Sequence, residues 1–351
     1  MKILSVDLGK FKSVSCLYQK DADHGDSAEF QTVVTDRDLF RQLIAKSSAD
    51  VVVFETCTVA GWLADLCEEL DAPFLVANPN GEAWRWSRIK RKTDRDDALK
   101  LARMTAMNEL PTVHVPSRGV RAKRSLLKFR EIIVRNRVAV QNEIRALWQA
   151  QGLPQLPSGA SLWTVAGIEL LQSHARPLSE CGSEDFWRGQ LQLLLASYEH
   201  SVGQEKDVDR KLEQLARKNE DIQRLMTIPG VGRCTAEVVC AWIDDPKRFN
   251  NGREVSSYAG LVPVQYQSGE SDRRGRITKR GSKLLRKRLV ECTWLLLRYN
   301  PWAQQLVQQI SRGQKTRKKQ AIVAVARRLL VRCWAMLRDG TNWEPPVTKP
   351  A

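Results

Sequence analysis

Histidine is scarce in this chain of 351 residues, which contains four His that lie far apart in the sequence. A metal site or an activated nucleophile that depends on imidazole is therefore poorly supplied. The eight Cys are scattered as well, and no two of them form a Cys-x-x-Cys pair. This spacing argues against a zinc site and a disulfide framework, and it predicts reduced cysteines in an intracellular protein.

Long hydrophobic runs are also missing, because no apolar stretch approaches the ~20 residues that a membrane-spanning helix needs. The apolar start of the chain ends at Asp7 and has no signal-peptide core. We therefore expect a cytoplasmic, nucleoid-associated protein of bacterial type with no membrane partner. At this length, and with 42% hydrophobic residues, the chain can bury the cores of two or more domains.

Acidic residues are nearly absent from one C-terminal block. Residues 271–340 contain 19 Lys and Arg but only 3 Asp and Glu, whereas the remaining 37 basic and 37 acidic residues balance. The whole net charge of +16 therefore lies in this block. Such a concentration of positive charge is typical of a protein that binds a polyanion, most simply DNA or RNA.

The first part of the chain has the pattern of a mixed α/β sheet. Alternating or β-branched runs predict strands at 2–8, 13–18, 28–35, 50–54 and 73–77. Helical spacing predicts helices at 36–46 and 56–70. Three early strands followed by alternating helix and strand indicate a mixed sheet, with sites expected where strands end.

Four carboxylates stand at positions where they could form a metal site. Asp7 and Glu55 each close a predicted strand, and Asp94 and Asp97 begin a predicted helix, with Asp94 as its N-terminal cap. Residues three apart share a helix face, so Asp94 and Asp97 can point to one place. Each acid alone is explained by a cap or an exposed strand end. Together they predict a site for Mg²⁺, whereas Asp96 has no role by spacing.

These residues resemble a known family. Asp7-Leu8-Gly9-Lys10, Phe54-Glu55-Thr56 and Lys92-Thr93-Asp94-x-x-Asp97-Ala98-x-x-Leu101-Ala102 are similar to the motifs of the DEDD transposases of the IS-one-ten insertion-sequence family. The resemblance implies a RuvC-like, ribonuclease H-like first domain. The first motif also opens actin-like ATPases, but no second Asp-x-Gly-Gly phosphate loop follows it.

Two long helical segments follow, at 117–152 and 183–226, separated by a Pro, Gly and Ser-rich linker at 154–161. Heptad-like apolar spacing in the second segment predicts an antiparallel hairpin, an intermolecular coiled coil or ordinary helix packing. In the resembled family this region is a coiled-coil connector that helps to assemble the oligomer. Next, Ile228-Pro229-Gly230-Val231-Gly232 predicts the turn of a helix-hairpin-helix element, in which Gly230 and Gly232 could hold a phosphate.

Residues 256–281 contain three glycine-bearing motifs, Ala259-Gly260-Leu261-Val262-Pro263, Gln267-Ser268-Gly269 and Arg274-Gly275-Arg276-Ile277-x-Lys279-Arg280-Gly281. They resemble the C-terminal domain of the same family, which implies that Ser268 is a nucleophile that forms a phosphoserine link to DNA. Ser271 is a close competitor, and Ser257 and Ser282 are remote ones. The basic residues predicted to contact nucleic acid are Arg273, Arg274, Arg276, Lys279, Arg280, Lys283, Arg317, Lys318 and Lys319.

Taken together, the motifs predict an α/β RuvC-like domain at 1–110, a helical or coiled-coil connector at 111–225, a mainly α serine transposase domain at 226–340 with the helix-hairpin-helix element, and a tail at 341–351. The resemblance implies a DNA transposase that exchanges strands with Mg²⁺, donor and target DNA, a structured guide RNA and a dimeric or tetrameric assembly. Two other readings stay open. One is a metal-dependent junction resolvase that hydrolyses DNA, and the other is a non-catalytic nucleic-acid-binding protein.

Overall fold

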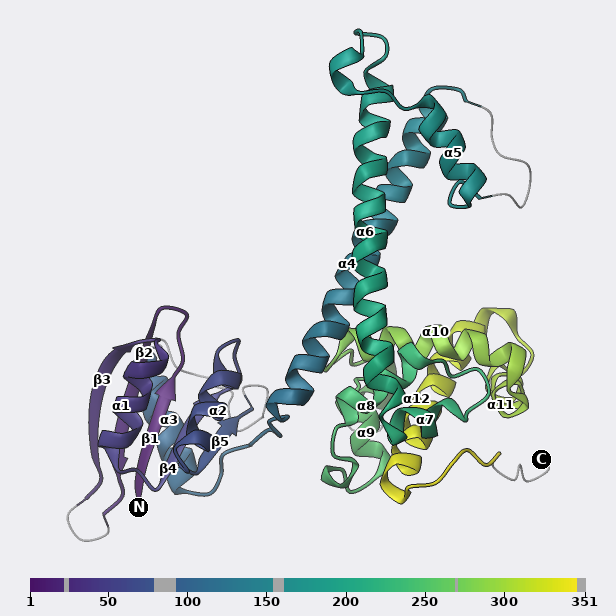
Figure 1. Cartoon of the computed structure of the whole chain (residues 1–351). Coiled ribbons are helices and arrows are strands. Elements are labelled where there is room, and N and C mark those ends of the chain that lie inside the picture. The colour runs from purple at the N-terminus through teal and green to yellow at the C-terminus, as the bar shows by residue number, and fades with distance from the viewer. Residues whose placement is uncertain (22–24, 79–92, 154–160, 269–270, 346–351) are drawn as a thin grey trace. The chain divides into compact units, whose positions relative to one another are not determined.

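The computed structural model describes residues 1–21, 25–78, 93–153, 161–268 and 271–345 (Figure 1). The chain forms two compact units, Met1–Arg121 and Ala122–Ala351. The predicted division into three domains and a tail stays a prediction.

The first unit is built on a mixed five-stranded sheet in the order β3-β2-β1-β4-β5. Its elements are β1 (Lys2–Asp7), β2 (Lys12–Gln19), β3 (Ser27–Val34), α1 (Arg37–Ser47), β4 (Val51–Glu55), α2 (Ala60–Glu69), β5 (Phe74–Ala77) and α3 (Asp94–Ala106). Strands β1, β2 and β3 pair antiparallel, whereas β4 runs parallel to β1 and β5 parallel to β4. The mixed α/β sheet predicted from the strand pattern is therefore confirmed.

Alternating side chains of the central strands supply two separate cores. On one face Leu4, Val6, Val52 and Phe54 pack with apolar residues of α1 and α2. On the other face lies α3, whose buried residues contact the alternate positions of β1 and β4. Because neighbouring strand residues point to opposite faces, the sheet is covered on both sides.

The second unit begins with two long helices. Its elements are α4 (Arg118–Ala150), α5 (Val165–His174), η2 (Leu178–Glu180), α6 (Phe186–Arg217), α7 (Glu220–Met226), α8 (Arg233–Ile243), η3 (Pro246–Arg248), α9 (Gly252–Tyr258), β6 (Pro263–Ser268), β7 (Ser271–Ile277), α10 (Lys283–Tyr299), α11 (Pro301–Ser311), η4 (Lys315–Arg317) and α12 (Lys318–Asp339). Helix α4 starts in the last residues of the first unit and continues into the second.

Helices α4 and α6 lie side by side and antiparallel (Figure 1). Near one end Leu127 shares a core with Leu212, and near the other Trp148 shares a core with Leu191. Arg130 and Arg137 of α4 form ion pairs with Glu205 of α6, so polar contacts fill the part between the two cores. The coiled-coil interpretation stays a prediction.

The second long helix ends earlier than its sequence pattern predicts. The sequence pattern predicts a single helix across 183–226, but α6 ends at Arg217 and a new helix, α7, starts at Glu220. Asn219 has extended backbone angles, and its side chain accepts a hydrogen bond from the Ile222 amide at 2.9 Å. Asparagine is a favoured N-terminal cap, so this residue breaks the helix and redirects the chain.

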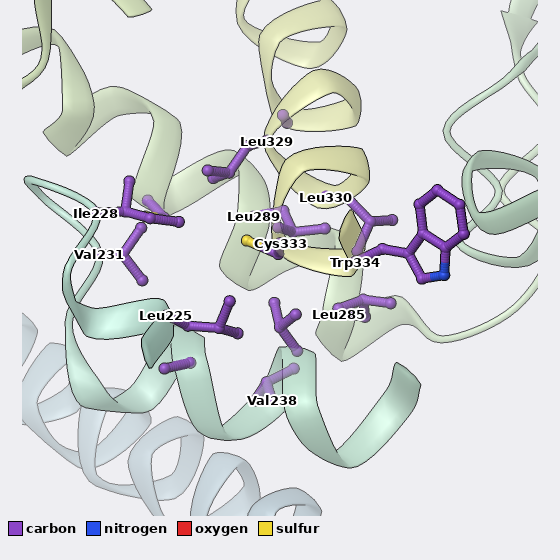
Figure 2. Close-up of a cluster of buried hydrophobic side chains, with 14 of the residues drawn as sticks. Leu225, Ile228, Val231, Val238, Leu285, Leu289, Leu329, Leu330, Cys333 and Trp334 are labelled. Atoms are coloured by element: carbon purple, nitrogen blue, oxygen red, sulfur yellow. The ribbon is translucent and has the colours of Figure 1, made fainter. Parts of the chain in front are cut away.

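The main core of the second unit joins helices that are far apart in the sequence (Figure 2). Leu225 and Val238 come from α7 and α8, Leu285 and Leu289 from α10, and Leu330, Cys333 and Trp334 from α12. Each of these side chains is less than a tenth exposed, and α10 and α12 supply much of the apolar surface. The predicted helical character of the C-terminal region is thus confirmed.

The segment with the glycine-bearing motifs contains a small sheet. Strands β6 and β7 pair antiparallel within the glycine-bearing region at 256–281. None of the described helices is long and apolar enough to cross a membrane. The eight Cys all lie in the described ranges, and none forms a disulfide.

Candidate active site and nucleic-acid surface

Asp7 and Glu55 lie at the ends of neighbouring parallel strands. Val6 of β1 and Phe54 of β4 are register partners, so the next residues, Asp7 and Glu55, follow at the same sheet edge. Alternate residues of a strand point to the same face, so Ile3, Ser5 and Asp7 share one face of β1. Ile3 belongs to the core that contains α3. Asp7 therefore faces α3. The same alternation through Val51 and Val53 turns Glu55 to that face.

Helix α3 runs antiparallel to β1 across this face. The Ser5 hydroxyl in the middle of β1 donates to the Ala98 carbonyl at 2.7 Å, and Lys20, beside the start of β1, donates to the Ala106 carbonyl at 3.2 Å. A helix rises about 1.5 Å per residue and a strand about 3.3 Å. The four residues from Ala98 back to Asp94 thus cover nearly the same length as the two from Ser5 to Asp7. The start of α3 therefore points to the edge that carries the two strand-end acids.

The first turn of α3 is capped by Thr93 and not by Asp94, which corrects the sequence prediction. The Thr93 hydroxyl accepts a hydrogen bond from the Asp96 amide at 3.3 Å and donates to the Asp96 carboxylate at 2.6 Å. The Thr93 hydroxyl thus caps the helix and is itself held by the Asp96 carboxylate. Asp94 becomes the first helical residue, where a carboxylate is favoured by the helix dipole.

Asp94 and Asp97 differ in their surroundings. Asp94 is exposed, whereas Asp97 is 7% exposed. Two residues before Asp97, the Arg95 guanidinium lies 5.6 Å from the ring centre of Phe30 on β3. Two positions on a helix are about 200° apart. Asp97 is therefore directed to the opposite side of α3, which is the side of β4 and Glu55.

The donor chemistry of these acids fits a hard divalent cation, which prefers carboxylate oxygens. Asp7, Glu55 and Asp97 face one end of the sheet, although no three His, Cys, Asp or Glu side chains of the described ranges form a ready-made metal cluster. The basic run at 88–92, immediately before α3, lies outside the described residues. The strand register brings the backbone of Asp7 and Glu55 to one sheet edge near the start of α3, and the shared metal site stays a prediction.

The serine region is held by two close backbone crossings. A Cβ on Gly260 would lie 2.0 Å from the Arg280 carbonyl oxygen, and one on Gly281 would lie 2.0 Å from the Tyr258 carbonyl oxygen. Both glycines have positive φ, +65° and +76°. The Arg286 guanidinium then donates to the carbonyls of Ala259, Arg280 and Gly281 at 2.7–3.1 Å. Only glycine permits this crossing, which fixes the base of the β6–β7 hairpin.

Ser268 and Ser271 are register partners at the closed end of that hairpin. The side chains of both serines, and that of Arg274, lie outside the described part, as do residues 269–270. The two remote competitors have other surroundings. Ser257 is exposed on α9, whereas the Ser282 hydroxyl accepts a hydrogen bond from the Leu285 amide and caps α10.

The turn predicted as a helix-hairpin-helix element connects α7 to α8. Gly230 has φ +91° and packs against Leu296 of α10, and its carbonyl accepts a hydrogen bond from the Cys292 thiol at 3.5 Å. Gly232 is exposed and precedes the first residue of α8. One side of the turn is thus anchored to the core, while the start of α8 is open to solvent. The phosphate contact assigned to this turn stays a prediction.

The predicted basic contacts are distributed over three elements. Arg273 and Arg276 lie on β7, Lys279 and Arg280 follow that strand, Lys283 opens α10, and Arg317, Lys318 and Lys319 surround the start of α12. All eight are exposed. Lys318 lies over the Trp294 ring at 5.4 Å, a cation–π contact that links α12 to α10. The role of Arg286 in holding the backbone crossing was not predicted from the sequence. A hydrogen bond from a side chain to distant backbone carbonyls leaves no recognisable pattern in the sequence.

Comparison with known proteins identifies the family. A profile described as Transposase IS116/IS110/IS902 family matches residues 222–308, and a DEDD transposase profile of the same type matches residues 4–150. The transposase of insertion sequence IS1111A of Coxiella burnetii is 32% identical over 70% of this chain and 66% of that protein. A probable family 20 transposase of Pseudomonas aeruginosa is 30% identical over 88% of this chain and 89% of that protein.

The chain therefore belongs to the IS110/IS116 family of transposases, and it is a DNA-acting enzyme of the transposase and recombinase class. The resemblance seen in the sequence motifs is confirmed. Among solved structures, RuvC of Thermus thermophilus is similar with a TM-score of 0.25 and 11% identity, over 32% of this chain and all of RuvC.

Proposed function

We propose that this transposase cleaves and exchanges DNA strands with Ser268 as the nucleophile and with Mg²⁺ held by Asp7, Glu55, Asp94 and Asp97. The observation that carries this proposal is the shared register of β1 and β4, which brings Asp7 and Glu55 to one edge beneath the start of α3. The buried position of Asp97 on the β4 side of α3 supports it. A divalent cation bound there would stabilise charge on phosphate and on the reacting oxygens.

The reaction of the serine is a phosphoryl transfer. The Ser268 Oγ bonds to a DNA phosphorus as a phosphodiester P–O bond of the strand breaks, and the hydroxyl proton passes to a base while the freed strand end takes a proton. A hydroxyl from another strand end then attacks the phosphoserine and releases Ser268. Since 226–340 contains no His, imidazole within this segment cannot act as the base. The exposed Arg and Lys residues on and after β7 would hold the flanking phosphates.

The family resemblance adds three further elements to this proposal. They are a structured guide RNA that pairs with donor and target DNA, assembly as a dimer or tetramer, and action at the DNA in the cytoplasm. The concentrated positive charge of 271–340 supports contact with nucleic acid of either kind.

A covalent-adduct assay tests the chemistry. The protein, with RNA transcribed from its native flanking DNA, is mixed with labelled donor and target DNA and Mg²⁺, and products are separated on denaturing gels. We expect a DNA–protein adduct that is lost in Ser268→Ala, because the attacking hydroxyl is gone. The adduct should be reduced at least 100-fold in Asp97→Asn, because the metal that stabilises the phosphoryl transfer would be bound less well. Omitting the RNA, or chelating the metal, should also abolish the adduct.

Matched variants make the result specific. Ser257→Ala changes an exposed serine of α9, and Asp96→Asn changes the capping acid of α3, so both should retain most of the adduct. An adduct that persists in Ser268→Ala but disappears in Ser271→Ala would move the nucleophile to its register partner. Cleavage without any adduct, lost only in Asp97→Asn, would instead show a hydrolytic resolvase and refute the role of Ser268.

A further inference from the structure

Four arginines surround a cavity of about 550 Å³ in the second unit. Arg253 comes from α9, whereas Arg327, Arg328 and Arg332 come from α12. None of the four belongs to the basic set predicted from the glycine-bearing motifs and the start of α12. Trp302 of α11 supplies an apolar wall, and it is only 8% exposed.

The fold brings these residues together by packing. On α12 the stripe that includes Val325, Leu329 and Cys333 is buried in the core. Arg327, Arg328 and Arg332 are spread over about 140° of the helix at 100° per residue, so they share the side left outside that stripe. At Gly252 the first turn of α9 approaches α12 so closely that a Cβ would lie 2.7 Å from Val331 Cγ1. This contact places Arg253 beside the three arginines of α12.

The four guanidinium groups form no ion pair with the described part of the chain. None of these arginines forms an ion pair or a side-chain hydrogen bond with another described residue. Elsewhere in the same unit Arg130, Arg137 and Arg233 are all paired with carboxylates. The acid next to Arg253, Glu254, accepts hydrogen bonds from Asn250 and Asn251 instead. Like charges gathered in one cavity repel, and an anion removes that repulsion.

We propose that this arginine cavity binds phosphate groups of a nucleic-acid backbone. The proposal rests on the proposed function only in that the protein handles nucleic acid. Guanidinium groups bind phosphate oxygens through paired hydrogen bonds, and several of them around a cavity suit successive phosphates. Val262 at the edge of the cavity leads directly into β6. A nucleic-acid strand held in this cavity would therefore lie close to the β6–β7 hairpin that carries Ser268.

The salt dependence of binding tests the proposal. The full-length protein and its Arg328→Ala/Arg332→Ala double variant are titrated against a labelled DNA duplex and against a labelled single-stranded RNA of equal length, at a series of salt concentrations. Each phosphate contact contributes about −0.9 to the slope of log K against log salt for duplex DNA and about −0.7 for a single strand. We expect the slope to become shallower by about 1.8 with duplex or about 1.4 with RNA if both contacts are lost.

Two control variants make the outcome decisive. Arg298→Ala removes one positive charge from an exposed position of α10 outside the cavity. It should change the slope of log K against log salt by less than half of the value for one phosphate contact. Arg328→Lys/Arg332→Lys keeps the charge but not the paired geometry, so it should retain the slope and weaken binding. Loss with duplex alone identifies DNA as the occupant, and loss with RNA alone identifies RNA. Equal effects of the double variant and Arg298→Ala, or no effect with either ligand, would overturn the proposal.

Because both substituted arginines are exposed, the variants should unfold at the wild-type temperature, which a thermal scan checks. The binding assay involves no chemistry. It can therefore succeed when the adduct assay fails, or fail when the adduct assay succeeds, so the two proposals are tested separately.

Discussion

At the scale of single residues, two glycines determine the shape of the serine region. Gly260 and Gly281 combine positive φ with carbonyl oxygens so close that no side chain fits. Their place in the sequence motifs has a physical reason, because the chain at 258–262 must cross the chain at 278–281. The three hydrogen bonds from Arg286 then hold the crossing.

We predict that Gly281→Ala destabilises the second unit by about 1–3 kcal/mol for the strained positive φ alone, and by more because the added Cβ would lie 2.0 Å from the Tyr258 carbonyl oxygen. The melting temperature should fall by several degrees, since about 1 kcal/mol corresponds to 2–4 °C in a domain of this size. The matched control is Gly203→Ala, at an exposed helical position of α6 with open space around it. Alanine there should be neutral or stabilising by up to about 1 kcal/mol. Equal melting temperatures for the two variants would contradict the crossing.

At the scale of elements, a chain of ion pairs joins α4, α6 and α8. Arg130 donates to both carboxylate oxygens of Asp209 at 2.8 Å, and this contact holds the pKa of Asp209 below its ordinary value. Arg233 connects Asp209 to Glu237, with a distance of 3.0 Å to each carboxylate. Glu237 is fully buried, and burial raises its pKa although Arg233 lies beside it.

The two carboxylates should therefore affect stability in opposite ways as pH changes. Because the pKa of Asp209 is lowered in the folded state, its ionised carboxylate stabilises the fold at pH values above the ordinary pKa of 3.8. This contribution is lost as the pH falls through the folded-state pKa. Because the pKa of Glu237 is raised in the folded state, its protonated form contributes stability at pH values below the ordinary pKa of 4.5. This contribution is lost as the pH rises through the folded-state pKa. The loss of stability in Asp209→Asn should thus shrink in acid, whereas Glu237→Gln should become relatively more stable as the pH rises.

Thermal scans of wild type and both variants across the acidic to neutral range measure these trends. The quantity compared is the difference in melting temperature between each variant and wild type at the same pH. If both differences change in the same direction with pH, the assignment of opposite pKa shifts to Asp209 and Glu237 is wrong.

At the scale of the whole molecule, the two units have separate cores. The two clusters that flank the sheet lie entirely within Met1–Arg121, and the clusters around α10 and α12 and around Trp148 lie entirely within Ala122–Ala351. Apolar burial is the main stabilising contribution in a domain of this size. Within the described ranges, each core cluster is thus built from residues of one unit.

We predict that residues 1–121 and 122–351 each fold when they are expressed alone. Each fragment should show a cooperative thermal transition by circular dichroism, because a chain of more than a hundred residues with its own core is large enough to be stable. A variant such as Val53→Asp, placed in the buried centre of β4, should abolish the transition of the first fragment and serves as its control. Absence of a transition in the unmodified first fragment would contradict the independence of the two units.

The sequence by itself determined the features that depend on local pattern. Alternation and β-branched runs located the five strands of the first unit, and helical spacing of apolar residues located α4. The carboxylates Asp7, Glu55 and Asp94 fell at two strand ends and a helix start as predicted. The family motifs were visible without any structure and are confirmed by comparison. These features follow from the preferences of neighbouring residues, which the order of the chain records directly.

Only the tertiary structure decided which distant residues meet. Alternation alone could not say that α3 covers the face of Asp7 and Glu55, because either face of the sheet was available. Likewise Arg253 and Arg332 are 79 positions apart, and they share a cavity because Gly252 packs against Val331. Local preferences define elements, whereas the burial of apolar surface between elements selects their partners. The physical reason is that packing depends on the whole chain at once.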